Sequence, residues 1–132
     1  MGKMKEHRQN RVLIVDANPD IAQLIRIVIE KSGNESLSVN TIGEAVGLVE
    51  EQQFDLLICD VGLNDGSCDE LVDTAHKRNP HMDVIVFIDG YRYSLSPRLR
   101  EDYCFPVERF NFKQLDEVVK VLFADPFTEG KP

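Results

Sequence analysis

The sequence predicts a doubly wound α/β domain, in which a five-stranded parallel sheet lies between two layers of helices. Two observations support this prediction. The apolar runs at residues 12–15 and 84–88 are continuous, as is typical of strands that are covered on both faces of a parallel sheet. Between such runs, apolar residues recur with the spacing that marks one face of a helix. Strands that alternate with helices in this way favour a three-layer α/β/α sandwich.

The first half of the chain contains two strand-helix units. After the strand at residues 12–15, Asn18 precedes Pro19, so a helix cap stands before a proline at the first helical position. Apolar residues at helical spacing follow, and Gly33 ends the helix. A weaker strand at residues 35–39 leads to a Thr-Ile-Gly-Glu capping box, which opens a second helix.

Three further strands and two helices are predicted in the second part of the chain, from residue 54 onward. Residues 54–59 form the third strand, and a capping-box pattern beginning at Ser67 opens the following helix. Residues 84–88 form the fourth strand. A brief fifth strand at residues 103–105 is expected to end at Pro106, because a central strand does not tolerate proline.

The last helix is capped at Asn111, and its apolar face is expected to consist of Leu115, Val118, Val119, Leu122 and Phe123. We therefore predict a flexible N-terminal arm at residues 1–10, one domain of the flavodoxin type at residues 11–124, and a C-terminal tail at residues 125–132.

The composition fits one globular domain that is rich in acids. Of 132 residues, 42% are hydrophobic and 29% are charged, and no apolar run is long enough to cross a bilayer. With 15 basic and 23 acidic residues, the formal charge is −8, which argues against direct binding of nucleic acid. We expect a cytoplasmic protein with neither a membrane nor a direct nucleic-acid partner.

The three cysteines, Cys59, Cys68 and Cys104, are odd in number and have no CxxC spacing. Neither a disulfide framework nor a zinc site is expected from this pattern. Reduced thiols are the default in the cytoplasm, and Cys59 and Cys104 are expected to be small apolar core residues.

Three acids, Asp16, Asp60 and Asp89, each follow a predicted strand. The carboxyl ends of parallel strands form the ligand crevice of this fold, and converging carboxylates there favour a hard cation such as Mg²⁺. Aspartate is also a common cap and turn residue, and for Asp89 that simpler interpretation is preferred. The cap-or-turn interpretation is weaker for Asp16 and Asp60, because neither stands at an obvious cap and because Gly62 would allow a ligand to approach the backbone closely.

The stretches VLIVDANPDI and LLICDVGLNDGS resemble the first and third strands, with their loops, of bacterial two-component response regulator receiver domains. The resemblance covers residues 11–123. It implies that Asp60 is the phosphoacceptor, which receives a phosphoryl group from a histidine kinase or phosphotransfer protein. It also implies that Asp16, Asp60 and the carbonyl group of Gly62 bind Mg²⁺.

Several positions depart from the pattern of that family, which implies a degenerate phosphorylation site. Ala17 replaces an acid and weakens the expected Mg²⁺ site. The family's Ser or Thr at the end of the fourth strand falls on Asp89 or Ile88. Its Lys, before the proline after the fifth strand, falls on Phe105 or is deleted. Arg92 is a candidate to replace the missing positive charge, although a solvated surface arginine is the simpler interpretation.

The segment from Asp89 to Phe105 is several residues shorter than in the family, which implies that the fourth helix is shortened or absent. Tyr103 resembles the family's aromatic switch residue. Alternatively, Tyr103 is a residue of the hydrophobic core. A homodimer through the aromatic-rich face at residues 91–110 remains open.

Two functions remain open at this stage. The first is a stand-alone receiver that is phosphorylated on Asp60 and signals through contacts with a downstream protein. The second is a pseudo-receiver, a protein-interaction module that does not depend on phosphorylation. Beyond transfer onto its own Asp60, we do not expect an enzyme. A flavin binder on the same fold would need a phosphate-cradling loop after the first strand, and DANPD offers none.

Overall fold

The computed structural model describes residues 9–60, 68–88 and 104–124. Its five parallel strands form one sheet in the order β2-β1-β3-β4-β5. The strands are β1 (Arg11–Val15), β2 (Glu35–Val39), β3 (Leu56–Asp60), β4 (Asp83–Ile88) and β5 (Cys104–Glu108). The helices are α1 (Pro19–Lys31), α2 (Ile42–Glu51), α3 (Cys68–Arg78) and α4 (Phe112–Leu122). The predicted flavodoxin-like α/β fold is confirmed.

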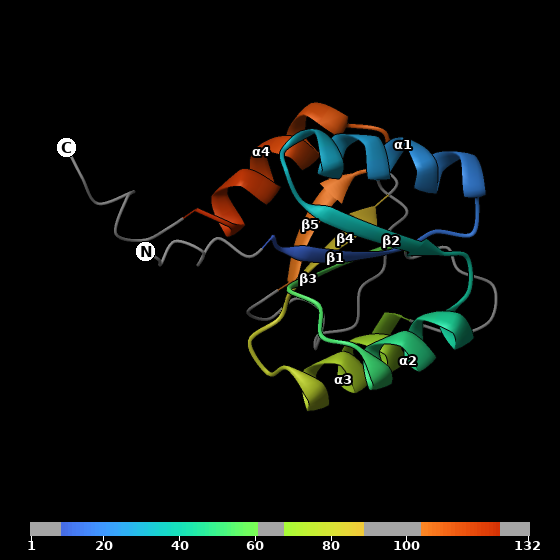
Figure 1. The fold of residues 1–132 in the computed structure, drawn as a ribbon. Coiled ribbons are helices and arrows are strands. Elements are labelled where there is room, and N and C mark those ends of the chain that lie inside the picture. Colours follow the sequence, from blue (N-terminus) through green and yellow to red (C-terminus); the bar gives the residue numbers. More distant parts are fainter. Residues whose placement is uncertain (1–8, 61–67, 89–103, 125–132) are drawn as a thin grey trace.

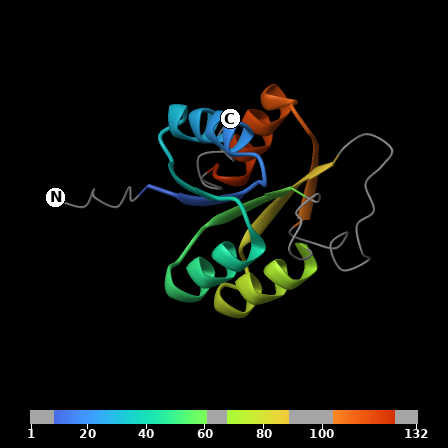
Figure 2. The ribbon, with the colours of Figure 1, turned by 90° about the vertical axis from the view of Figure 1, so that its right-hand side faces the viewer.

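The sheet lies between two pairs of helices, with α1 and α4 on one face and α2 and α3 on the other (Figures 1 and 2). Successive side chains along a strand point to opposite faces of the sheet, so they pack into two separate halves of the core. The half under α1 and α4 includes Val12, Ile14, Leu56, Ile58, Ile85, Phe87 and Val107. The half under α2 and α3 includes Leu13, Val15, Leu57, Cys59, Val84 and Val86. A slip of one residue would exchange the two faces, but both are apolar, so the helices must fix the register by packing.

Helix caps account for the positions at which three helices begin. The side chain of Asn18 accepts hydrogen bonds from the N–H groups of Asp20 and Ile21. Thr41 and Asn111 accept in the same way from the N–H groups three residues later, at 3.1 and 3.0 Å. Each cap satisfies a backbone donor that has no partner within the helix. The three predicted caps are therefore confirmed, whereas Ser67 lies outside the described residues.

Strand β5 is longer than the sequence indicated, and the prediction that it ends at Pro106 is wrong. It continues to Glu108, with Pro106 opposite Val86 of β4. Because β5 is an edge strand, the missing N–H group of proline need not interrupt the hydrogen-bonded ladder. Phe105 consequently lies in the middle of the strand, opposite Ile85, where it packs against the core instead of facing the carboxyl edge.

Several predictions fall outside the described residues. They concern Gly62, Asp89, Arg92, Tyr103, the shortened or absent fourth helix and most of the aromatic-rich face at residues 91–110. Within the part of the chain that the structure describes, no helix combines the length and the apolar character needed to cross a bilayer.

Candidate functional site

Two buried acids stand at the carboxyl ends of adjacent strands. Asp60 is the last residue of β3, the central strand, and Asp16 follows the last residue of β1. Their exposed fractions are only 4% and 1%. Both carboxylates approach the same guanidinium group, so the structure brings together the two acids that the sequence singled out.

Backbone contacts on both sides hold Asp16 in place. Its N–H group donates to the carbonyl oxygen of Val39, and its own carbonyl oxygen accepts from the side-chain amide of Asn40 at 2.9 Å. Its Oδ1 accepts from the N–H group of Asn18 at 2.9 Å. Its Oδ2 is buried and has no hydrogen-bond partner among the described residues. One carboxylate oxygen is thus anchored, while the other still has the capacity to accept.

Arg109 is the cation beside these acids, and the sequence analysis missed it. It directly follows β5, and its backbone N–H group donates to the carbonyl oxygen of Ile88 at 2.8 Å. Its guanidinium nitrogen lies 3.5 Å from Oδ2 of Asp60 and 3.9 Å from Oδ1 of Asp16. An arginine directly after the fifth strand therefore places positive charge beside both acids.

A tight turn carries Arg109 from β5 into α4. The N–H group of Asn111 donates to the carbonyl oxygen of Glu108 at 3.1 Å. Within this turn Phe110 has a φ of 69°, in the left-handed region that bulky side chains rarely adopt. Its ring lies 5.2 Å from the guanidinium carbon of Arg109. The turn thus holds a strained residue against the cation of the site.

The environment of Asp16 favours its neutral form. Burial raises the pKa of Asp16 above the ordinary value of 3.8, and the charge of Asp60 adds to this effect. The hydrogen bond from Asn18 and the charge of Arg109 act in the opposite direction. A buried carboxylate beside a second carboxylate is stabilised by any cation that enters.

The two carboxylates fit a hard divalent ion. Mg²⁺ is usually held by one or two carboxylates and several waters, and Oδ2 of Asp16 is a buried acceptor without a partner among the described residues. Beyond this pair, the described part of the chain contains no group of three or more His, Cys, Asp or Glu side chains that could hold a metal. Ala17, which is exposed, adds no ligand.

Two cysteines lie next to the acid of β3. The sulfur atoms of Cys59 and Cys68 are 2.9 Å apart, and both side chains are buried. Their mutual hydrogen bond, together with burial, raises the pKa of the Cys59 thiol well above its usual range. The prediction that Cys59 is a core residue is confirmed, but its proximity to Cys68 was not foreseen.

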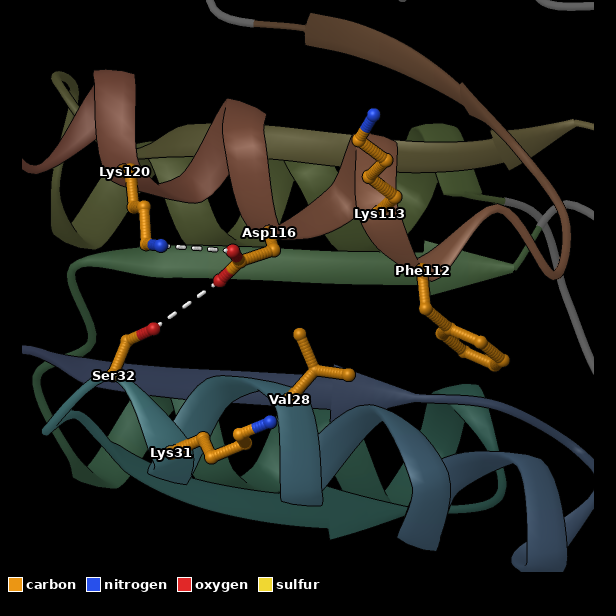
Figure 3. Close-up of a pocket in the computed structure, with 7 residues that line it drawn as sticks. All are labelled: Val28, Lys31, Ser32, Phe112, Lys113, Asp116 and Lys120. Carbon is orange, nitrogen blue, oxygen red and sulfur yellow. Dashed lines mark hydrogen bonds and ion pairs between the residues drawn. The ribbon is translucent and has the colours of Figure 1, made fainter.

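A separate groove of about 410 Å³ lies between α1 and α4 (Figure 3). Asp116 of α4 connects the two walls, because it accepts a hydrogen bond at 3.2 Å from Ser32, which caps α1. Asp116 also pairs with Lys120 within α4 at 3.0 Å. The lining residues are Val28, Lys31, Ser32, Phe112, Lys113, Asp116 and Lys120. None of them belongs to the acidic site.

Comparisons with known proteins identify the family and the fold. Residues 12–90 match the model of the response regulator receiver domain. Response regulator protein PilR of Pseudomonas aeruginosa is 34% identical over 76 residues, which are 58% of this chain but only 17% of that protein. The chain therefore spans less than a fifth of that relative.

Two solved structures extend the likeness to the fold. A CheY-like receiver domain protein from Methanospirillum hungatei JF-1 has a TM-score of 0.76 and 29% identity, covering 93% of this chain and 100% of that one. TrrA from Thermotoga maritima, in complex with Mg(2+)-BeF, has a TM-score of 0.73 and 28% identity, covering 87% of this chain and 100% of that one. The fold and a family match across more than half of the chain lead to one conclusion: it belongs to the response regulator receiver domain family of two-component signalling.

Proposed function

We propose that this receiver domain accepts a phosphoryl group on Asp60 from a histidine kinase or phosphotransfer protein, and then acts through contacts with a downstream protein. The position of Asp60 carries the proposal. It ends the central strand at the carboxyl edge of the sheet, beside a second acid and 3.5 Å from a guanidinium nitrogen. Ligand crevices of doubly wound sheets lie at this edge.

The transfer that we propose exchanges one bond to phosphorus for another. The bond between phosphorus and the donor's imidazole nitrogen breaks, and the imidazole leaves with the bonding electron pair. A bond forms between phosphorus and a carboxylate oxygen of Asp60. Negative charge spreads over the phosphoryl oxygens during this step, so the chain contributes mainly by positioning the groups and by placing positive charge nearby.

Asp16 and Asp60 would hold Mg²⁺ in this site, with the Gly62 carbonyl group as the third protein ligand that the family resemblance implies. When bound, the ion neutralises charge on the phosphoryl oxygens. The unpartnered Oδ2 of Asp16 supports this assignment, as does the complex of the relative TrrA with Mg(2+)-BeF. Because Ala17 offers no oxygen from its side chain, we expect weaker binding than an additional acid would give.

Arg109 would take the place of the lysine that the family uses after the fifth strand. Its guanidinium group has several donors in a planar fork, which suits phosphoryl oxygens. Its side chain is about 29% exposed, so it can turn toward an incoming group. We assign it a positioning and charge-neutralising role beside Asp60.

The second candidate is a pseudo-receiver that binds partners without phosphorylation. One observation favours it: Arg109 approaches both carboxylates at 3.5 and 3.9 Å, and therefore partly neutralises the acidic pair without a metal ion. In this alternative the Arg109 contacts would be structural, and Asp60 would not react.

Labelling with an acyl phosphate separates the two candidates. The protein is incubated with acetyl phosphate and Mg²⁺ and then weighed intact. Phosphorylation predicts one added phosphoryl group that hydroxylamine removes, since an acyl phosphate reacts with this reagent. Asp60→Asn should abolish the adduct, whereas Asp20→Asn, which alters an exposed acid at the start of α1, should retain it. No adduct on the wild type, beside a receiver that labels normally, would favour the pseudo-receiver.

A further inference from the structure

Two thiol groups meet beside the backbone of Asp60. Cys59 precedes Asp60 in β3, and Cys68 is the first residue of α3. Their sulfur atoms are 2.9 Å apart, and they lie 3.7 and 3.5 Å from the backbone carbonyl oxygen of Asp60. Cys59 and Cys68 therefore stand on either side of the proposed phosphoacceptor in the sequence, and their sulfur atoms meet beside its backbone carbonyl group.

We propose that Cys59 and Cys68 are an oxidative modification site, which a peroxide converts into an intrachain disulfide. The sulfur atoms need only approach from 2.9 Å to a bonded distance of about 2.05 Å. The two side chains come from different elements, a strand and a helix, so the bond would tie β3 to α3. Disulfides of cytoplasmic proteins are usually transient and redox-sensing, which suits a reversible modification.

The oxidation is balanced with one peroxide molecule per chain. Cys68 is 6% exposed and Cys59 is fully buried, so the peroxide reaches Cys68 first. The sulfur of Cys68 takes one oxygen atom, which gives a sulfenic acid and one water. The sulfur of Cys59 then attacks it: the S–O bond breaks, the S–S bond forms, and the hydroxide leaves with the thiol proton as a second water. The sulfurs lose two electrons in total, and the peroxide gains them.

Closure of this bond would act on Asp60, a consequence that rests on the proposed function. It removes the two thiol protons, which serve both the Cys59–Cys68 contact and the contacts with the Asp60 carbonyl oxygen, and it ties β3, which contains Asp60, to α3. A displacement of about 1 Å at a reacting group can slow a reaction by on the order of 100-fold. We therefore expect slower phosphorylation of Asp60 in the oxidised protein.

The modification itself is tested by mass, without reference to phosphorylation. The full chain is treated with hydrogen peroxide and analysed before and after reduction. We expect each chain to lose two hydrogen atoms, about 2 Da, with a single Cys59–Cys68 peptide pair. Cys104→Ala should retain this loss, whereas Cys68→Ala and Cys59→Ala should each abolish it. An unchanged mass, a pair that includes Cys104, or a linkage between two chains would overturn the proposal.

The effect on Asp60 is measured in a second arm. Labelling by acetyl phosphate is compared between the oxidised and reduced proteins, with oxidised Cys68→Ala as the control for other peroxide damage. Slower labelling of only the disulfide form supports the regulatory consequence, and equal rates would overturn it. If the reduced protein does not label at all, the proposed function fails, but the mass result still decides whether the disulfide forms.

Discussion

The guanidinium group of Arg109 lies 3.5 Å from the carboxylate of Asp60, although 49 positions separate the two residues in the chain. The contact joins the end of the central strand to the residue after the edge strand. It also places Arg109 where an ion bound between Asp16 and Asp60 would compete with it for negative charge. Two opposite effects of this arginine can therefore be predicted.

Replacement of Arg109 should slow phosphorylation. Arg109→Ala removes a positive charge and several donors beside Asp60, and we expect labelling by acetyl phosphate to become slower by about tenfold at saturating Mg²⁺. Arg109→Lys should restore part of the rate, because the charge returns without the planar fork. Arg26→Ala, which removes a half-buried arginine that pairs with Glu30 on α1, serves as the matched control. Equal rates for Arg109→Ala and Arg26→Ala would remove Arg109 from the proposed chemistry.

The same replacement should strengthen Mg²⁺ binding. Without the arginine, the two carboxylates lose their nearest described cation and gain about 1 kcal/mol of attraction for a divalent ion, roughly fivefold in Kd. The midpoint of thermal unfolding, followed over a Mg²⁺ titration, measures this affinity because ligand binding stabilises the folded state. Asp16→Asn should weaken or abolish the rise in midpoint. A weaker response in Arg109→Ala than in the wild type would contradict direct competition.

Most of the fold could be predicted from local patterns. The continuous apolar runs identified buried parallel strands, and the caps at Asn18, Thr41 and Asn111 located three helix starts. Each of these signals involves residues within a few positions of one another in the chain, so it can be recognised without knowledge of the three-dimensional structure. Asp16 and Asp60 could also be identified, because each follows an apolar run whose position in a parallel sheet places its end at the ligand edge.

Arg109 could not be identified, because that required the position of a strand within the sheet. Proline excludes a central strand but not an edge strand, and only the topology shows that β5 is an edge. A strand that ended at Pro106 would leave the residue after Glu108 away from the carboxyl edge, whereas β5 extends to Glu108 and brings Arg109 to that edge. The contact between Cys59 and Cys68 was missed for a related reason, since it depends on how α3 packs against β3.

Asp16 should destabilise the folded protein at neutral pH. Because its pKa is raised in the folded state, mainly by burial, the folded protein binds this proton more tightly than the unfolded chain. The stabilisation by the bound proton is complete below the ordinary pKa of 3.8 and is lost as the pH rises through the folded value. Asp16→Asn, which cannot ionise, should therefore have a higher free energy of unfolding than the wild type at pH 7.

Denaturant titrations at several pH values without Mg²⁺ measure this difference. The advantage of Asp16→Asn should shrink toward zero as the pH approaches 3.8. Asp16→Ala is the control, since it removes the charge but also the acceptor of the Asn18 N–H group, and it should be less stable than Asp16→Asn at every pH. If the difference in free energy of unfolding between the wild type and Asp16→Asn did not change with pH, ionisation of Asp16 could not be the cause of that difference.

The turn beside the site stores strain at Phe110, and glycine should relieve it. The φ of 69° costs a residue with a side chain on the order of 1 kcal/mol, but costs glycine little. Phe110→Gly should therefore unfold at a higher temperature than Phe110→Ala, although both lose the same ring, which is 58% exposed. Gly33 has a φ of 90° and open space around it, so Gly33→Ala should destabilise the protein by a similar amount. If Phe110→Ala equals or exceeds Phe110→Gly in thermal stability, the turn is not strained, and another cause must hold Phe110 beside Arg109.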